Sequence, residues 1–298
     1  MTRMPALGMV ATPGRRAQMI EIAKQADERG FTGIHVPSLS ACMPFCQAVL
    51  AETKNIVVGT SIQPIYLQHP RELAANAALL HEISGGRFQM GIGVSHAPVY
   101  DRLGLKVGKP ISDMRDYVAT MRAQEDVGEL PPIVLATLRN KMLSLSGEAG
   151  DGAVWANGAR SYIPSQLEAT GIKAGDNFFV GNMLPTVIDD DREAAGAVHK
   201  RTITGYLNLP NYRNYWREAG YADEIAEVEN AIEAGDQSRL PDIMGDAWLS
   251  DVTLYGSADY IREQVEESLS NGITPILVPS STSGGMAKAI AEVFAIFE

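Results

Sequence analysis

A regular alternation of short β-rich runs with stretches of helical pattern constrains the fold of this chain most strongly. Such alternation is typical of parallel strands joined by right-handed helical crossovers. Eight strands are predicted, in the runs ALGMVAT from Ala6, GIHVPS from Gly33, NIVVGTSI from Asn55, RFQMGIGV from Arg87, IVLATL from Ile133, GAVWAN from Gly152, NMLPTVI from Asn182 and TPILVPS from Thr274. Helices are predicted between and after them, over residues 15–29, 45–53, 71–83, 112–124, 141–149, 161–170, 190–206, 258–270 and 285–297.

This pattern predicts the α/β class and a closed (β/α)8 TIM barrel rather than an open doubly wound sheet. No GxGxxG motif stands at the first strand-to-helix turn, and the nearest echo is Gly91-Ile92-Gly93 within or just after the fourth predicted strand. Residues 209–249 interrupt the rhythm, so we expect an insertion before the last helix and strand of the barrel. It would either cover the barrel mouth or extend the outer helical layer. We expect one domain over residues 1–298.

Charge and apolar patterning exclude several function classes. The chain has 25 Lys and Arg against 36 Asp and Glu, a formal net charge of -11, which disfavours binding to nucleic acid or anionic lipid. No segment approaches the ~18 to 20 apolar residues that cross a bilayer, so a soluble cytoplasmic protein is expected. Cys42 and Cys46 match no zinc or disulfide framework, and no metal site is predicted. No HExxH motif and no nucleophile elbow appear, which disfavours metal hydrolysis and acyl transfer.

Three segments together resemble a known family. The run NIVVGTSIQPIYLQHPRELAANAALLHEISGGRFQMGIGVSH is similar to the luciferase-like pattern of strand, His-Pro, Ala-rich helix, Ser-Gly-Gly-Arg and Gly-x-Gly strand. LATLRNKMLSLSGEAGDGAVWANG resembles the family's unit from the fifth to the sixth strand, and DDDREAAGAVHKRTITGYLNLPNYRNYWREAGY its seventh-helix region. The ordered set covers most of the chain. Tyr206 to Asn214 resembles the branch that uses the deazaflavin coenzyme F420 rather than FMN.

The resemblance implies an F420-dependent oxidoreductase that moves a hydride between the deazaflavin C5 and a small organic substrate. Two alternatives stay open: an FMN-dependent luciferase-like monooxygenase on the same barrel, and a non-catalytic flavin- or F420-binding protein. F420 carries a phosphodiester followed by lactyl and glutamyl groups, whereas FMN ends in a phosphate monoester. Cofactor preference therefore separates the two enzymes.

The position of a motif along its strand separates structural from functional residues. Catalytic residues of TIM barrels lie at the carboxyl ends of the strands, and features at the opposite end serve stability. Ser84-Gly85-Gly86-Arg87 and Asp151-Gly152 precede their strands, so we expect them to brace the bottom of the barrel. The Asp189-Asp190-Asp191 run is expected to cap a helix.

For the cofactor, the resemblance implies a cis peptide without proline at Ser61-Ile62, followed by Gln63, that backs the deazaflavin ring; such bonds are rare. It also implies backbone contacts from Thr137 and Leu138 to the tail, beside Arg139, which stands where a glycine is common in the family. At the next strand end, a helix N-terminus with an adjacent Arg suits a phosphate. The predicted cofactor-binding residues are Ser61, Ile62, Gln63, Val94, Ser95, Thr137, Leu138, Arg139, Asn157, Gly158 and Arg160.

Few polar residues are expected near the reacting atoms. Hydride transfer needs orientation and exclusion of water more than a strong acid or base. Ser38, Ser40 and His96 are the predicted catalytic candidates. The second strand end lacks the acidic residue and His on which sugar-phosphate dehydrogenases of the family depend, so an apolar or conjugated substrate is favoured.

Two further expectations concern His residues and assembly. His35 inside a strand, His81 inside a helix and His199 on a polar helix face are expected to be structural or solvated. The Ala-rich helix from Leu73 to Leu80 offers a small-residue face for close packing between subunits, so a homodimer is predicted.

Overall fold

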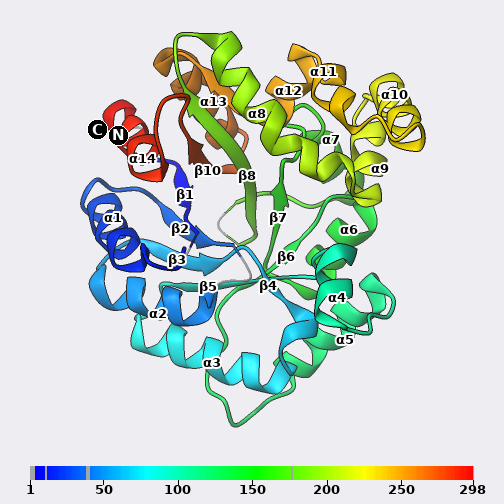
Figure 1. Ribbon diagram of the computed structural model, residues 1–298. Coiled ribbons are helices and arrows are strands. Elements are labelled where there is room, and N and C mark those ends of the chain that lie inside the picture. Colours follow the sequence, from blue (N-terminus) through cyan, green and yellow to red (C-terminus); the bar gives the residue numbers. More distant parts are fainter. Residues whose placement is uncertain (1–3, 11, 38–40, 176, 298) are drawn as a thin grey trace.

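The computed structural model describes residues 4–10, 12–37, 41–175 and 177–297, and its parallel strands close into a barrel (Figure 1). Strand pairing runs β10-β1-β2-β3-β5-β6-β7-β8, and β10 pairs again with β8 to close the ring. The barrel strands are β1 (Ala6–Gly8), β2 (Gly33–Val36), β3 (Val57–Thr60), β5 (Phe88–Gly93), β6 (Ile133–Ala136), β7 (Gly152–Ala156), β8 (Phe179–Ile188) and β10 (Thr274–Ser280). All eight predicted strands are present, which confirms the TIM barrel.

Helices form an outer layer around the ring of strands in Figure 1. This layer contains α1 (Arg16–Glu28), α2 (Cys42–Glu52), α3 (Pro70–Ile83), α5 (Pro110–Arg122), α6 (Asn140–Ala149), α7 (Ile163–Thr170), α8 (Arg192–Leu207), α13 (Ala258–Ser270) and α14 (Met286–Ile296). Local end signals explain several boundaries. Pro70 begins α3 behind His69, whose ring accepts from the Arg71 N–H, and Asp191 caps α8 by accepting from the Ala194 N–H. The predicted capping role of the Asp run is therefore confirmed.

The predicted insertion is also present before the last barrel helix and strand. It contains α9 (Pro210–Glu218), α10 (Ala222–Glu233), the short η2 (Gln237–Arg239), α11 (Leu240–Ile243) and α12 (Asp246–Val252). Its own core is aromatic: Tyr215, Trp216 and Trp248 are each at most 1% exposed. Figure 1 places these helices together, outside α7 and α8.

Several short elements were not predicted. They are β4 (Gln63–Pro64), η1 (Ile65–Leu67), α4 (Ala97–Leu103) and β9 (Leu254–Gly256). β4 pairs with β5, and β9 pairs with β8 beside the barrel. None is long enough to show a periodic apolar pattern, which is the signal on which the sequence prediction depends.

Small and aliphatic side chains fill the barrel interior. This inner cluster consists of Ala6, Val134, Val154, Met183 and Ile276. His35 on β2 stacks on Phe179, with ring centroids 5.6 Å apart, and is 3% exposed. Burial lowers the pKa of His35 to about 4, so the ring is neutral at pH 7. The expected structural role of His35 fits this position.

Arg87 braces the bottom of the barrel, as predicted for the Ser-Gly-Gly-Arg motif. Its guanidinium donates to the carbonyls of Ser84, Leu50, Thr53 and Ile56 at 2.9 to 3.2 Å. These bonds join the end of α2 to the start of β3. Asp151 similarly accepts from the Ile133 N–H at 2.8 Å, which ties the starts of β6 and β7 together.

The face on which the homodimer prediction was based is occupied within the protomer. Ala74, Ala77 and Ala78 on α3 are at most 2% exposed, so the expectation of a free Ala-rich face is wrong. The exposed apolar residues of α3 are Leu79 and Ile83, on its other side. The homodimer itself stays a prediction.

His199 has a structural role, one of the two expected for it, but it lies on a buried helix face instead of a polar one. It is 0% exposed, and its Nε2 donates to the Leu254 carbonyl at 2.9 Å. The sequence pattern missed this because β9, which contributes Leu254, was not predicted and covers that face of α8. In the described part of the chain, no helix is long and apolar enough to span a membrane, and no three His, Cys, Asp or Glu side chains gather as a metal site.

Candidate active site

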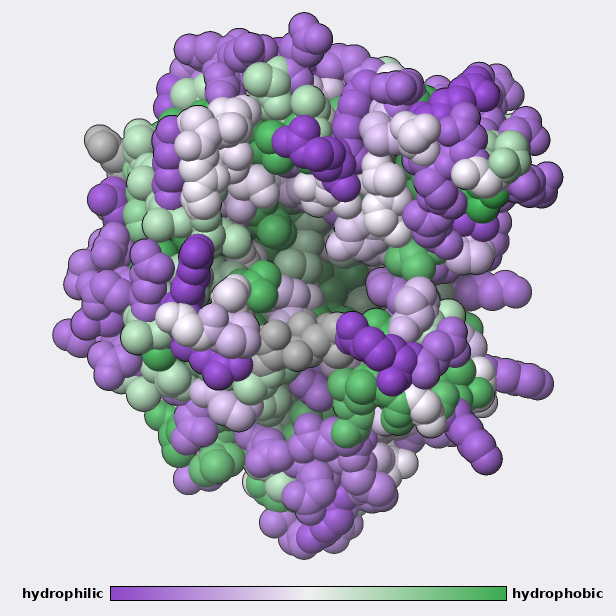
Figure 2. Space-filling model, in the orientation of Figure 1, coloured by the Kyte–Doolittle hydropathy of each residue, from purple (hydrophilic) through white to green (hydrophobic). Residues whose placement is uncertain are grey.

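The barrel brings four of the predicted segments to neighbouring strand ends. Residues 61–63 follow β3, 94–96 follow β5, 137–139 follow β6 and 157–160 follow β7, and these strands are adjacent in the sheet. Figure 2 shows the molecule hollowed at its centre, over the ring of strands in Figure 1. Ser38 and Ser40, two of the predicted catalytic residues, lie outside the described residues. The site is therefore built from the ends of β3 to β7.

The chain bulges after β3 and packs against β5 and β6. The Ser61-Ile62 peptide bond is cis, as the resemblance implied. Glycines on β5 make room for the bulge. A Cβ on Gly91 would lie 1.9 Å from the Thr60 carbonyl oxygen, and one on Gly93 would lie 2.7 Å from Ile62 Cγ1 and 2.9 Å from Ala136 Cβ. Ile62, half-buried, is thus seated between the carboxyl ends of β5 and β6.

The two polar side chains of the bulge have partners within the protein. The Ser61 hydroxyl lies 3.0 Å from Met183 Sδ, toward the barrel interior. Gln63 Oε1 accepts from the Cys42 thiol at 2.8 Å. Burial raises the pKa of Cys42 to about 11, so the thiol keeps its proton at neutral pH. Backbone and apolar surface, rather than free side-chain donors, are what the bulge offers a ligand.

His96 stands at the end of β5, just before α4. Ser95 has a φ of 61°, which turns the chain after Val94, and the His96 ring then lies 5.7 Å from the ring of Tyr212 on α9. His96 Nδ1 is buried without a partner among the described residues. Burial also lowers the pKa of His96, so the ring is neutral at pH 7. Neutral imidazole offers a ligand one donor and one acceptor.

Tyr212 is a candidate site residue that sequence reasoning missed. It lies in the insertion, 3% exposed, between Tyr206 and Trp216 with ring centroids 4.8 and 5.2 Å away. The insertion contains several aromatic residues, and only the fold shows that Tyr212 is the one whose ring lies against His96.

The β6–α6 connection has free backbone donors. The Thr137 N–H donates to Val154 O at 2.9 Å, which continues the sheet by one residue. The next four N–H groups, at residues 138–141, have no acceptor within the described parts of the chain. They lie at the N-terminus of α6, where the helix dipole favours an anion. Arg139, beside them, forms an ion pair with Glu218 of α9.

The β7–α7 connection is different because its donors are already used. The Asn157 N–H donates to Met183 O at 2.9 Å, and the Gly158 N–H and carbonyl exchange two hydrogen bonds with the Asn182 amide at 3.1 and 2.9 Å. The Ala159 N–H donates to the Tyr215 hydroxyl at 2.9 Å. Asn157 Nδ2 remains a buried donor without a partner among the described residues. The predicted cofactor contacts of Asn157 and Gly158 stay predictions, and the side chain of Asn157 is what this loop still offers.

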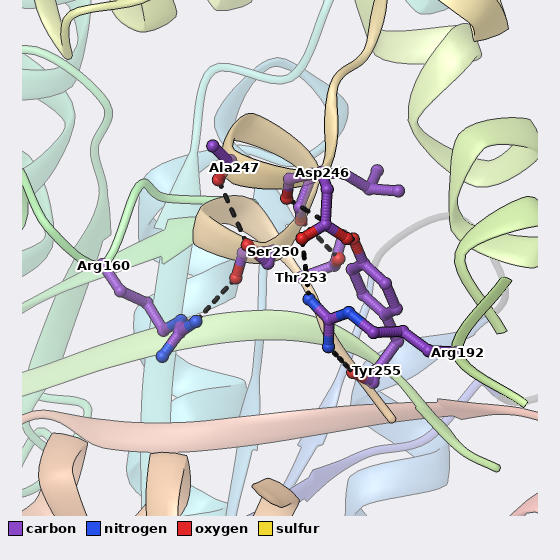
Figure 3. Close-up of polar contacts among 8 residues, drawn as sticks. Arg160, Arg192, Asp246, Ala247, Ser250, Thr253 and Tyr255 are labelled. Carbon is purple, nitrogen blue, oxygen red and sulfur yellow. Dashed lines mark hydrogen bonds and ion pairs between the residues drawn. The ribbon is translucent and has the colours of Figure 1, made fainter. Parts of the chain in front are cut away.

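The Arg160 side chain forms hydrogen bonds with residues outside the barrel. Its guanidinium donates to the Ser250 carbonyl at 2.6 Å, as Figure 3 shows, and to Gln264 Oε1. Arg160 and Asp251 line a cavity of about 240 Å³ between β8 and α13, outside the barrel wall. In the same view Arg192 joins Asp246 to the Tyr255 carbonyl, which fixes α12 against α8 and β9. The contact of Arg160 with a phosphate stays a prediction.

These groups fit a flavin-type cofactor. An apolar seat is present at Ile62, and a row of free N–H groups at the α6 N-terminus suits an anionic tail. The buried Nδ2 of Asn157 and Nδ1 of His96 have no partner among the described residues. Buried polar atoms are normally hydrogen-bonded, so both positions favour a bound ligand.

Comparison with known proteins agrees with this arrangement. The model of the luciferase-like monooxygenase family matches residues 3–274. A 5,10-methylenetetrahydromethanopterin reductase of Methanolobus tindarius is 25% identical over 298 residues, covering 90% of this chain and 91% of the relative. Among solved structures, the coenzyme F420-dependent tetrahydromethanopterin reductase of Methanopyrus kandleri has a TM-score of 0.72 at 18% identity, covering 99% of this chain and 100% of that one. An F420-dependent secondary alcohol dehydrogenase, solved with an F420-acetone adduct, has a TM-score of 0.69 at 18% identity over 99% of this chain and 98% of that one.

Proposed function

Because the chain belongs to the luciferase-like monooxygenase family, we propose that it is an F420-dependent oxidoreductase that transfers a hydride between the deazaflavin C5 and a small organic substrate. The observation that carries the proposal is the seat formed by Ile62 between Gly93 and Ala136, beside four N–H groups at the α6 N-terminus that have no acceptor among the described residues. An apolar, planar ring with an anionic tail suits this pair of features. The relatives described above, which use F420, support the choice of cofactor.

The chain's own residues have distinct tasks in this proposal. When bound, F420 supplies the atom that gives or takes the hydride. Ile62 supports one face of the ring, and the N–H groups of residues 138–141 bind the tail. Asn157 Nδ2 donates a further hydrogen bond, because it is buried and unsatisfied without one.

His96 and Tyr212 form the substrate side of the site. The neutral His96 ring can donate a hydrogen bond to a substrate oxygen and orient it without adding charge. Tyr212 and its aromatic neighbours exclude water from the same region, which protects a hydride in transit. Because this part of the site offers neutral and aromatic groups, we propose a neutral ketone or conjugated carbonyl compound as the substrate class.

Isotope transfer tests the reaction. Purified protein is incubated with reduced F420 deuterated at C5 and with a panel of small ketones and enones. The proposal expects one substrate class to gain a single deuterium at carbon while the absorbance of oxidised F420 appears in equal amount. Oxidation of F420 only with oxygen uptake, with no deuterium in any product, would contradict hydride transfer. His96→Ala is expected to reduce turnover more than it reduces F420 binding.

A further inference from the structure

The β6–α6 connection is joined to the insertion by one ion pair. Arg139 Nε donates to Glu218 Oε1 at 2.9 Å, and Nη2 donates to the same oxygen. The pair connects the first residue before α6 with the last residue of α9. Two donors that share one oxygen form a weaker arrangement than a fork that meets both oxygens of a carboxylate.

Both side chains of this pair are exposed, so another anion can compete with Glu218 for Arg139. The side chain of Arg139 is 52% exposed and that of Glu218 is 35% exposed. Exposed ion pairs contribute little to stability, because water and salt compete for both charges. Displacing Glu218 from Arg139 by another anion should therefore change the free energy of unfolding little.

The location of Arg139 indicates that the competing anion is the tail of the cofactor. A Cβ on Gly93 would lie 2.7 Å from Ile62 Cγ1 and 2.9 Å from Ala136 Cβ, and only two residues separate Ala136 from Arg139 along the chain. At the neighbouring β7–α7 connection, the N–H groups of residues 157–161 all donate within the protein. Of these two strand ends, the end of β6 thus combines a cation with N–H groups that have no acceptor in the described parts of the chain.

We propose that Arg139 binds the anionic tail of the cofactor and that Glu218 is its competing partner, released when the tail binds. This inference rests on the proposed function and concerns how its cofactor is selected. Arg139 then determines the specificity for the tail. Glu218, which belongs to the insertion, competes with the tail for Arg139 and so lowers the affinity for F420. The ring seat at Ile62 is independent of this exchange.

The test separates the tail from the ring. Binding of F420 is compared with binding of its tail-free chromophore, the same deazaflavin with only the ribityl chain, by fluorescence titration at low and high salt. Arg139→Gln is expected to weaken F420 binding about tenfold, the size of one lost charge-assisted hydrogen bond. Glu218→Gln is expected to strengthen F420 binding about threefold, because it removes the competitor. Neither variant should change the affinity for the tail-free chromophore.

Matched controls come from the other end of the same helix. Glu148, near the other end of α6, forms an exposed ion pair with Arg115 of α5, and the two side chains are 54% and 51% exposed. Arg115→Gln and Glu148→Gln make the same changes in charge and should leave both affinities unaltered. Higher salt should reduce the advantage of wild type over Arg139→Gln.

The outcomes distinguish the two proposals. If wild type binds both ligands, but Arg139→Gln and Glu218→Gln alter the two affinities equally or not at all, the exchange is overturned and the proposed function stands. If wild type binds neither ligand, the proposed function fails and the exchange fails with it.

Discussion

Single residues at the carboxyl ends of the strands determine which ligand the barrel can bind. Gly93 lets Ile62 approach β6. The buried Nδ2 of Asn157 has no partner in the part of the chain that the structure describes, while the backbone of Gly158 is hydrogen-bonded to Asn182. Motif resemblance indicated the positions of Ser61 and Ile62, and the strand end before a helix N-terminus indicated that of Asn157. Neither indicated which donors the fold would use, because Asn182 and Tyr215 lie 24 and 56 residues away in sequence from their partners.

We predict that Gly93→Ala lowers cofactor affinity at least tenfold. The added Cβ would meet Ile62 at 2.7 Å and displace the ring seat. Gly205 on α8 is the control, since a Cβ there meets nothing within 4 Å. Fluorescence titration of both variants with F420, after a check of their thermal unfolding, measures the effect. Equal affinity for Gly93→Ala and Gly205→Ala would show that Ile62 does not support the ring.

Acid should destabilise the protein through two buried His rings. Burial lowers the pKa values of His35 and His199 to about 4, below their value of 6.5 in the unfolded chain. As pH falls from 6.5 toward 4, the unfolded state binds protons that the folded state does not, so stability falls through this window. His199→Gln, which cannot titrate, should lose less free energy of unfolding between pH 7.5 and 4.5, by roughly 2 kcal/mol. Urea unfolding at the two pH values measures this, and parallel losses in both proteins would refute it.

At the scale of elements, long periodic segments were predictable and short ones were not. The eight barrel strands and nine outer helices follow from apolar period and from end signals such as Pro70 and Asp191. The sequence predicted the insertion, but it did not show that α9 lies against the ends of β5, β6 and β7. Those contacts depend on distant partners, such as the Trp216 indole N–H that donates to Asn157 O at 3.2 Å.

We predict that Tyr215→Phe loosens the contact between α9 and the β7–α7 connection. The hydroxyl accepts from the Ala159 N–H, and both residues are 0% exposed, so its loss leaves a buried donor unsatisfied. The expected cost is about 1 to 3 kcal/mol of unfolding free energy. Tyr206→Phe is the matched control, because Tyr206 contributes a ring contact to Tyr212 and should change stability by less than about 0.5 kcal/mol. Denaturant unfolding of both variants distinguishes them, and equal stability would contradict the prediction.

At the scale of the whole molecule, we propose that barrel and insertion form one domain. Trp155 on β7 and Trp216 and Trp248 in the insertion belong to the same apolar cluster, which also includes Val180 and Val187 of β8. The insertion therefore completes the outer packing of the barrel on this side. The sequence predicted where the insertion begins, but the shared cluster is a property of the folded chain.

A single cooperative transition is the expected result when the protein is unfolded by urea. Tryptophan fluorescence and far-ultraviolet circular dichroism should report the same midpoint, because the indoles and the barrel strands share one cluster. A fluorescence change that clearly precedes the loss of secondary structure would show that the insertion unfolds by itself.

The central claim, that this barrel binds F420, is tested most directly by titrating the purified protein with F420 and, separately, with FMN. Fluorescence quenching reports binding, and protection against thermal unfolding confirms it. We predict saturable binding of F420 with a rise in the unfolding temperature, and little of either effect with FMN. Tighter binding of FMN, or no binding of either cofactor, would contradict the assignment.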